Sequence, residues 1–177
     1  MSELRITEIF HSLQGETSTT GLPTVFVRLT GCPLRCGYCA TAYAFEGGQK
    51  MAPSDIMATV NDYGARYVTV TGGEPLAQPK CIDLLEQLCD AGYRVSLETS
   101  GAMSVADVDP RVFKIVDLKT PGSGEMARNL YDNIPLLLPH DEVKFVICDR
   151  PDYDWSCLKM DELQLADRVA EILFSPR

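Results

Sequence analysis

Three cysteines stand at C-x3-C-x2-C spacing, at Cys32, Cys36 and Cys39. They directly follow an apolar, β-branched run over residues 24–29 that is typical of a strand. A loop that leaves a strand can fold three thiolates around one metal centre, and thiolate sulfur is a ligand that zinc and iron–sulfur clusters favour. The spacing therefore predicts a soft metal centre at the end of this strand.

The nature of the metal follows from the ligand count. Structural zinc takes four ligands, commonly as two Cys/His pairs, and neither His11 nor the distant Cys81 forms a paired motif with the three cysteines. A disulfide framework is disfavoured because the chain has seven cysteines, an odd number, and no secretory signal opens it. Iron–sulfur clusters usually take four cysteines, so three leave one iron free for another ligand. We therefore expect an iron–sulfur cluster with one open iron.

The composition limits the remaining classes of function. At 177 residues and 45% hydrophobic, residues 1–177 are expected to form one domain. No apolar run is long enough to span a bilayer. The net charge of −9 disfavours a nucleic-acid partner but leaves a small anionic substrate open. The start at residues 1–4 is typical of a cytoplasmic chain, so we expect a cytoplasmic protein without membrane or nucleic-acid partners.

Strand-like and helix-like segments alternate along the chain. This alternation predicts βαβ units and an α/β fold with a mostly parallel sheet. About six strands on so short a chain predict an incomplete βα barrel or a strongly curved sheet, not a closed barrel of eight. The expected strands cover residues 24–29, 66–71, 93–98, 113–118, 142–147 and 169–174. The expected helices cover residues 78–91 and 153–167.

Polar, glycine-rich clusters follow four of the expected strands, at residues 31–39, 71–75, 98–101 and 117–124. Ligands gather at the carboxyl ends of parallel strands, so these clusters predict one binding rim. Taken alone, each cluster also has a plain structural interpretation. Two glycines after a strand often form only a turn, and Ser100 is an ordinary cap for a following turn.

The motifs together resemble a known superfamily. The cysteine loop, with Tyr38 before its last cysteine, and the Gly-Gly-Glu-Pro run at residues 72–75 resemble the two signatures of radical S-adenosylmethionine (SAM) enzymes. That resemblance implies the partial βα barrel of those enzymes. The runs at residues 11–16, 98–101 and 117–124, with Thr41 and Tyr43 after the cluster loop, are more narrowly similar to the 7-carboxy-7-deazaguanine synthases. The similarity extends from about residue 5 to the end of the chain.

The resemblance implies three cofactors: a 4Fe-4S cluster on the three cysteines, SAM, and Mg²⁺ held by Thr41. Glycines at the second signature would let the backbone approach SAM where a side chain would collide. The SAM-binding residues that the resemblance implies are Tyr38, Ala40, Gly72, Gly73, Glu74, Ser100, Asp117 and Lys119.

The same resemblance implies a lyase reaction in 7-deazapurine and queuosine biosynthesis. The substrate would be 6-carboxy-5,6,7,8-tetrahydropterin, whose ring contracts to 7-carboxy-7-deazaguanine with loss of ammonia. Its carboxylate would meet Arg28, which from the pattern alone is equally consistent with a surface arginine on a half-exposed strand. The implied substrate contacts are Leu13, Gln14, Gly15, Glu16, Arg28 and Thr71. The implied partners are an electron donor such as a flavodoxin and a second copy of the chain.

The sequence departs from the family pattern in two places. Ala40 stands where the family usually has an aspartate, which predicts weaker use of Mg²⁺ at Thr41. The chain ends at Arg177, where the family usually continues through a further helix and strand that help to close the pocket.

Two other functions share the cysteine motif. A glycyl-radical-enzyme activase also uses C-x3-C-x2-C, but it acts on a protein backbone and leaves residues 13–16 without a clear role. A non-catalytic iron–sulfur or zinc module leaves residues 72–75 and the other rim motifs unexplained.

Overall fold

The computed structural model describes residues 3–177, so Met1 and Ser2 of the cytoplasmic-type start lie outside the described residues. The strands are β1 (Leu4–Leu13), β2 (Pro23–Leu29), β3 (Gln49–Met51), β4 (Tyr67–Gly72), β5 (Arg94–Thr99), β6 (Phe113–Asp117), β7 (Glu142–Ile147) and β8 (Glu171–Pro176). The α-helices are α1 (Pro53–Asp62), α2 (Cys81–Asp90) and α3 (Arg150–Glu162). Short 3₁₀ helices cover Ala42–Ala44, Pro75–Ala77, Pro121–Ser123, Met126–Arg128, Tyr131–Leu136 and Leu165–Asp167.

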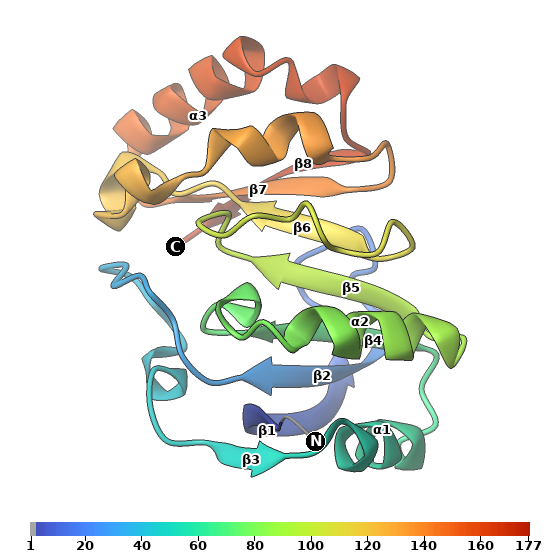
Figure 1. Cartoon of the computed structure of the whole chain (residues 1–177). Helices are drawn as coiled ribbons and strands as arrows, with labels where there is room; N and C mark the ends of the chain where they lie inside the picture. Colours follow the sequence, from blue (N-terminus) through green and yellow to red (C-terminus); the bar gives the residue numbers. More distant parts are fainter. Residues whose placement is uncertain (1–2) are drawn as a thin grey trace.

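All eight strands form one open sheet in the order β3-β1-β2-β4-β5-β6-β7-β8 (Figure 1). The six strands from β2 to β8 in that order run parallel, whereas β1 and β3 join antiparallel at one end. This confirms the expected partial βα barrel with about six parallel strands. The sequence analysis missed β1, β3 and α1.

Two helix boundaries differ from expectation for identifiable reasons. Helix α2 begins at Cys81, after the expected residue 78, because Gln78 is extended, the conformation that the following Pro79 favours. Helix α3 begins at Arg150, before the expected residue 153, because the Asp149 side chain accepts a hydrogen bond from the Asp152 N–H at 3.0 Å and caps the first turn. Pro151 lies in that first turn, where its missing N–H is not needed.

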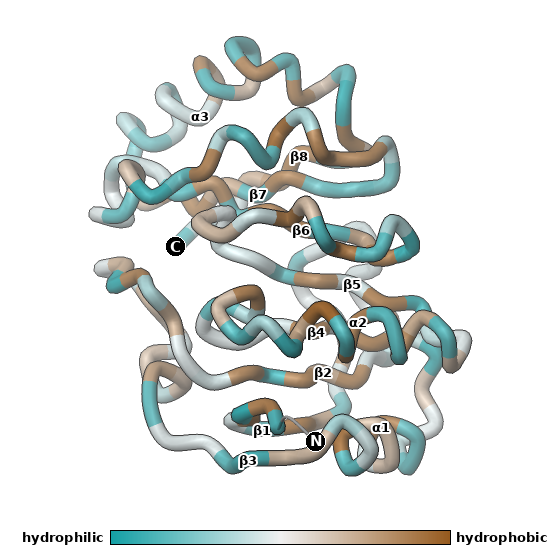
Figure 2. Tube along the Cα trace, in the orientation of Figure 1, coloured by the Kyte–Doolittle hydropathy of each residue, from teal (hydrophilic) through white to brown (hydrophobic). Residues whose placement is uncertain are grey.

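The strands alternate between an apolar and a polar face, as a period of two residues requires. The apolar set packs under α1, α2 and α3, and Figure 2 shows hydrophobic stretches along the strands and α2 beside a mostly hydrophilic α3. That set includes Val25, Val27, Val68, Val70, Val95, Leu97, Val116, Val143 and Phe145. The residues between them line cavities on the other face: Arg28, Thr69, Thr71, Ser96, Glu98, Asp117, Glu142 and Lys144. The pattern that builds the core therefore also places polar side chains on one surface.

The connection between β1 and β2 crosses this polar face, behind β5 and β6 in the view of Figure 1. Gln14 Nε2 donates to Thr69 Oγ1 of β4 and to Glu98 Oε1 of β5, each at 3.3 Å. Ser18 donates from its N–H and its hydroxyl to the buried Glu142 carboxylate of β7. The loop is thereby held against strands that are more than fifty residues away in the sequence.

A buried ion pair lies on the opposite face, next to the hydrophobic core. Lys114 of β6 lies 2.8 Å from Asp141, with the two side chains 3% and 0% exposed. The Asp141 carboxylate also accepts hydrogen bonds from the backbone N–H groups of Lys114 and Leu138. Among the helices of residues 3–177, none is long and apolar enough to cross a membrane.

Replacing Lys114 by methionine is expected to lower the free energy of unfolding by about 3 kcal/mol, because the variant leaves the Asp141 charge buried without its cation. Urea denaturation followed by circular dichroism measures this. The control is Lys80→Met, which breaks an exposed 2.8 Å ion pair with Asp83 and should change stability by less than about 0.5 kcal/mol. A loss below about 1 kcal/mol in Lys114→Met would contradict the prediction.

Candidate active site

A cavity of about 670 Å³ lies at the carboxyl ends of β2, β4, β5, β6 and β7. All the site residues expected from the sequence line it, except Leu13 and Glu74. Leu13 ends β1 with its side chain mostly exposed, and Glu74 is fully buried behind the cavity wall. The predicted binding rim is therefore one continuous space in the structure.

The cysteine loop is held in place by backbone contacts on both sides. The Gly31 N–H donates to the Ala44 carbonyl at 2.8 Å, and the Gly31 carbonyl accepts from the Glu74 N–H at 2.8 Å. The Gly37 N–H donates to the Ser123 carbonyl at 3.0 Å. The Arg35 guanidinium donates to the Cys32 carbonyl at 2.8 Å, so it is a local structural cation as expected.

Cys32, Cys36 and Cys39 all line the cavity. Burial raises the pKa of the Cys32 and Cys36 thiols, with carboxylates nearby adding to this and Lys119 opposing it, so without metal these thiols are protonated at neutral pH. Metal binding would have to release those protons. Within residues 3–177, no three His, Cys, Asp or Glu side chains converge closely enough for one ion. Three thiolate donors in one cavity are a ligand set that fits an iron–sulfur cluster with one open iron.

The two glycines of the second signature have a structural role that the sequence analysis did not foresee. A Cβ on Gly72, whose φ is +148°, would lie 2.2 Å from the Leu29 carbonyl oxygen. A Cβ on Gly73 would lie 2.2 Å from the Gly31 carbonyl oxygen and 2.8 Å from the Cys32 Cβ. Gly72 therefore lets this loop pack against Leu29 at the end of β2, and Gly73 lets it pack against the start of the cysteine loop.

The Glu74 carboxylate joins the second signature to the loop after β5. It accepts hydrogen bonds from the Leu76 N–H at 3.0 Å, from the Thr99 hydroxyl at 2.9 Å and from the Ser100 N–H at 2.7 Å. The Ser100 hydroxyl also donates to it. Glu74 does not line the cavity, whereas Ser100, which its carboxylate holds, does.

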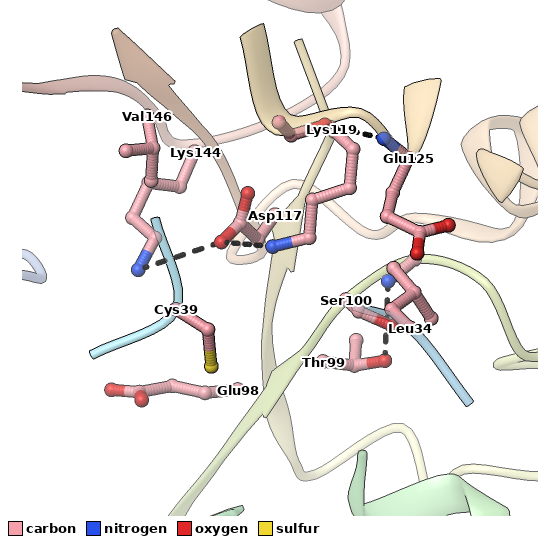
Figure 3. A network of polar contacts seen from close by, with 12 residues as sticks. Leu34, Cys39, Glu98, Thr99, Ser100, Asp117, Lys119, Glu125, Lys144 and Val146 are labelled. Atoms are coloured by element: carbon pink, nitrogen blue, oxygen red, sulfur yellow. Dashed lines mark hydrogen bonds and ion pairs between the residues drawn. The ribbon is translucent and has the colours of Figure 1, made fainter. Parts of the chain in front are cut away.

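A chain of charges from β6, the loop after it and β7 runs along the other side of the cavity (Figure 3). Lys119 Nζ lies 2.9 Å from Asp117 Oδ2, and Lys144 Nζ lies 3.9 Å from the same oxygen. Burial opposes the charged form of both lysines, but the nearby carboxylates outweigh it and raise their pKa values. Both lysines are therefore cations at neutral pH.

Two buried polar atoms at this position have no hydrogen-bond partner among the described residues: Asp117 Oδ1 and the Tyr38 hydroxyl. Burial, followed by the nearby Asp117 charge, raises the pKa of the Tyr38 phenol well above its usual range, so it stays neutral. A buried acceptor without a partner is costly unless a ligand supplies the donor. The site thus fits a ligand that carries hydroxyl or amine donors, as SAM does.

The substrate-side residues are arranged around Gln14 and Glu98. Gln14 Oε1 accepts from the Gly15 N–H at 2.8 Å, so the amide shapes its own loop. Glu98 Oε2 accepts from the Thr71 hydroxyl at 2.9 Å, while its other oxygen faces Gln14. Glu16 extends further along this loop, and its carboxylate lies 2.8 Å from Lys144 Nζ.

Arg28 is a fixed cation in the cavity wall and not a loose surface arginine. Its Nε donates to Glu8 Oε1 at 2.7 Å, and its side chain is only 14% exposed. The guanidinium lies over the rings of Phe10 and Tyr43. Although burial opposes ionisation of Glu8, hydrogen bonds from Arg28 and Tyr43 hold the pKa of its carboxyl below the usual value. The remaining guanidinium N–H groups are the part of Arg28 that can meet an anion.

Thr41 and Ala40 line the cavity beside the last cysteine, with Thr41 Oγ1 3.8 Å from Cys39 Sγ. One hydroxyl is a modest Mg²⁺ ligand, and Mg²⁺ commonly completes its shell with water and substrate oxygens. His11 is not part of this site: it stacks on Tyr63 at 5.9 Å between ring centroids and does not line the cavity.

Sequence reasoning missed several lining residues. Lys144 was treated only as a strand position, although it falls on the polar side of the strand alternation, which is the signal that could have found it. Phe45 follows the Ala42–Ala44 turn, which gave no signal. Leu34, Glu98 and Thr99 lie in the predicted rim clusters but were given no role of their own. The lining residues outside the predicted clusters and site residues are Phe26, Phe45, Ile115, Lys144, Val146, Ser175, Pro176 and Arg177.

Comparison with known proteins agrees with this geometry. The family model of the radical SAM superfamily matches residues 26–116. The 7-carboxy-7-deazaguanine synthase of Koribacter versatilis is 46% identical over 175 residues, which cover 98% of this chain and 77% of that protein. The synthase of Chlorobaculum tepidum is 47% identical over 156 residues, which cover 86% and 71%.

Solved structures show the same fold. The crystal structure of QueE from Escherichia coli superposes with a TM-score of 0.76 at 26% sequence identity, covering 99% of this chain and 84% of that one. Streptococcus suis SuiB bound to S-adenosylmethionine matches with a TM-score of 0.61 at 15% identity, covering 83% and 38%, a likeness of fold alone. By its sequence relatives, its matched family model and its fold, the chain belongs to the 7-carboxy-7-deazaguanine synthase family of radical SAM enzymes.

Proposed function

We propose that this chain converts 6-carboxy-5,6,7,8-tetrahydropterin to 7-carboxy-7-deazaguanine and ammonia, the product for which its relatives are named. The observation that carries the proposal is that one cavity contains the three cysteines, the unpartnered Asp117 oxygen and the fixed Arg28 cation. A cluster, a cofactor rich in donors and an anionic substrate would therefore lie within reach of one another.

The cluster and SAM are assigned by the donors that this chain offers. Cys32, Cys36 and Cys39 would hold the cluster, and SAM would lie against Ser100 and Asp117. The other SAM contacts that we propose are Tyr38, Ala40, Gly72, Gly73 and Lys119 in the cavity wall, with Glu74 acting from behind it. When bound, the reduced cluster and SAM supply a carbon radical that abstracts hydrogen; the protein places that chemistry and excludes side reactions.

The protein's own groups then orient the pterin. Arg28 would pair with the substrate carboxylate as a fixed cation, because Glu8, Phe10 and Tyr43 already hold its guanidinium. Glu16 would accept hydrogen bonds from the exocyclic amine, and Gln14, Gly15 and Thr71 would shape the wall beside the ring. Leu13, which points away from the cavity here, would contribute through its backbone alone. Thr41 would hold Mg²⁺ against substrate oxygens.

The remaining assignments follow from the proposed chemistry. The cluster needs an electron from outside, so we infer a partner such as a flavodoxin. We also infer that residues 1–177 act as a single domain, since both hydrophobic clusters pack on one sheet. A homodimer and a cytoplasmic location complete the proposal. The glycyl-radical-enzyme activase and the non-catalytic module are not retained, because the chain's relatives are synthases matched over most of their length.

An anaerobic assay tests the proposal. Protein with a reconstituted cluster is mixed with SAM, dithionite, Mg²⁺ and 6-carboxytetrahydropterin, and mass spectrometry follows 5′-deoxyadenosine and 7-carboxy-7-deazaguanine. Both compounds are expected with the parent protein, and neither with Cys36→Ala, which loses a cluster ligand. Cys157→Ala, a half-buried thiol on α3, is the matched control and should retain both. Deoxyadenosine without the deazapurine would point to another substrate.

Replacing Ala40 by aspartate is expected to lower the Mg²⁺ concentration for half-maximal activity by about tenfold, because a carboxylate about 4 Å from a divalent cation gains on the order of 1–2 kcal/mol even in water. The measurement is a Mg²⁺ titration of deazapurine formation. Ala42→Asp adds the same charge at an exposed position outside the cavity and should leave the titration unchanged. An unchanged response in Ala40→Asp would show that position 40 does not tune the metal.

A further inference from the structure

We propose that Lys144 is a positioning residue that fixes the carboxylates of the two ligand subsites, Glu16 on the pterin side and Asp117 on the SAM side. This inference rests on the proposed function, because that function supplies the two ligands. Nothing in the sequence motifs pointed to Lys144; its place in the sheet does.

The position of Lys144 is set by the strands. In the parallel pairing of β6 with β7, Lys144 lies opposite Asp117, and the Lys144 carbonyl accepts a hydrogen bond from the Leu118 N–H at 2.9 Å. Its side chain lies on the polar face, lines the cavity and is 12% exposed. The Lys144 side chain is therefore attached to a backbone position that the sheet holds in place.

From there the ammonium reaches both carboxylates. Lys144 Nζ lies 2.8 Å from Glu16 Oε2 and 3.9 Å from Asp117 Oδ2. Glu16 belongs to the loop that crosses the sheet from β1, 128 residues away in sequence from Lys144. A lysine ammonium has three rotatable donors at one point, so it can serve two acceptors that lie in different directions.

The Asp117 carboxylate is left ready for a ligand by this arrangement. Lys119 and Lys144 both approach Oδ2, whereas Oδ1 is buried and has no partner among residues 3–177 (Figure 3). The two cations thus hold one oxygen and leave the other to accept a hydrogen bond. A ribose hydroxyl or an amine of SAM has the donor that this oxygen needs.

The Glu16 carboxylate is held more weakly, and this suits a substrate contact. Its side chain is 58% exposed, and an ion pair that faces solvent adds little to folding stability. Glu16 can therefore keep its contact with Lys144 while it accepts from an incoming exocyclic amine, at little cost. Removing Lys144 should change ligand affinity much more than it changes stability.

The test measures binding of two ligands by the anaerobic, cluster-reconstituted protein: 6-carboxypterin through its fluorescence, and S-adenosylhomocysteine by calorimetry. Lys144→Met is expected to lower the affinity for each ligand by about tenfold, which is the size of effect that coupling between contacting residues produces. Glu16→Gln should lower the affinity for 6-carboxypterin and leave the affinity for S-adenosylhomocysteine unchanged. In the double variant the two losses of 6-carboxypterin affinity should be clearly less than additive, because Lys144 acts on this ligand through Glu16. Lys80→Met, a surface lysine with its own ion pair, is the matched control.

Parent-like affinity for both ligands in Lys144→Met, or fully additive losses in the double variant, would overturn the proposal while the proposed function stands. If the parent protein itself fails to bind 6-carboxypterin, the proposed function falls and this inference with it. Lys144→Gln, which keeps a donor but removes the charge, gives the same test if the methionine variant does not fold.

Discussion

The buried carboxylate of Glu74 is the interaction on which the arrangement of this site depends. The backbone N–H of Glu74 donates to the Gly31 carbonyl at the start of the cysteine loop. The Glu74 side chain accepts hydrogen bonds from Leu76, Thr99 and Ser100. Three loops that follow three different strands thus meet at one residue that is fully excluded from water. A carboxyl group in such a place is tolerated because both of its oxygens accept hydrogen bonds. Moving any of these loops would break a hydrogen bond of the buried Glu74, and this cost holds the loops in place relative to one another.

Elsewhere in the cavity, polar side chains are also held by partners, in this case as ion pairs. Strand alternation puts apolar side chains under the helices and polar ones on the opposite face, so charges gather where a ligand enters. Most of these charges are neutralised before a ligand arrives: Arg28 by Glu8, and Lys119 by Asp117. Among the residues that the structure describes, the buried polar atoms of the cavity without a hydrogen-bond partner are Asp117 Oδ1 and the Tyr38 hydroxyl. Because groups of this kind are already held in position, they can orient a bound ligand without rearranging.

Much of this was predictable from the sequence, because the features involved are local. The cysteine spacing, the glycine-rich turns and the strand patterns can each be recognised within a short segment of sequence. All but two of the expected site residues line the cavity. The antiparallel strands β1 and β3 were missed because their pairing partners are set by tertiary contact rather than by a local pattern. Helix α1 also escaped prediction, although Pro53 opens it and Asp55 lies in its first turn.

The roles of individual residues were less predictable than their positions. Glu74 was expected to bind SAM; the structure places its side chain outside the cavity, where it accepts a hydrogen bond from the Ser100 N–H. The glycines at 72 and 73 were expected to let SAM approach the backbone. Both line the cavity, and the structure adds that Gly72 makes room for Leu29 of β2 and Gly73 for the start of the cysteine loop. Lys144 was unremarkable in the sequence because its significance comes from Glu16 and Asp117, which only the folded sheet brings near it.

The most direct test of this account is the electron paramagnetic resonance spectrum of the reduced cluster in Glu74→Gln, recorded with and without SAM. In either amide orientation the glutamine NH₂ would face at least one N–H donor, of Leu76 or of Ser100, so the loops should separate. We predict that the variant retains a cluster but loses the spectral change that SAM causes in the parent protein and in the exposed-position control, Glu86→Gln. A SAM response equal to that of the parent would contradict the central role of Glu74.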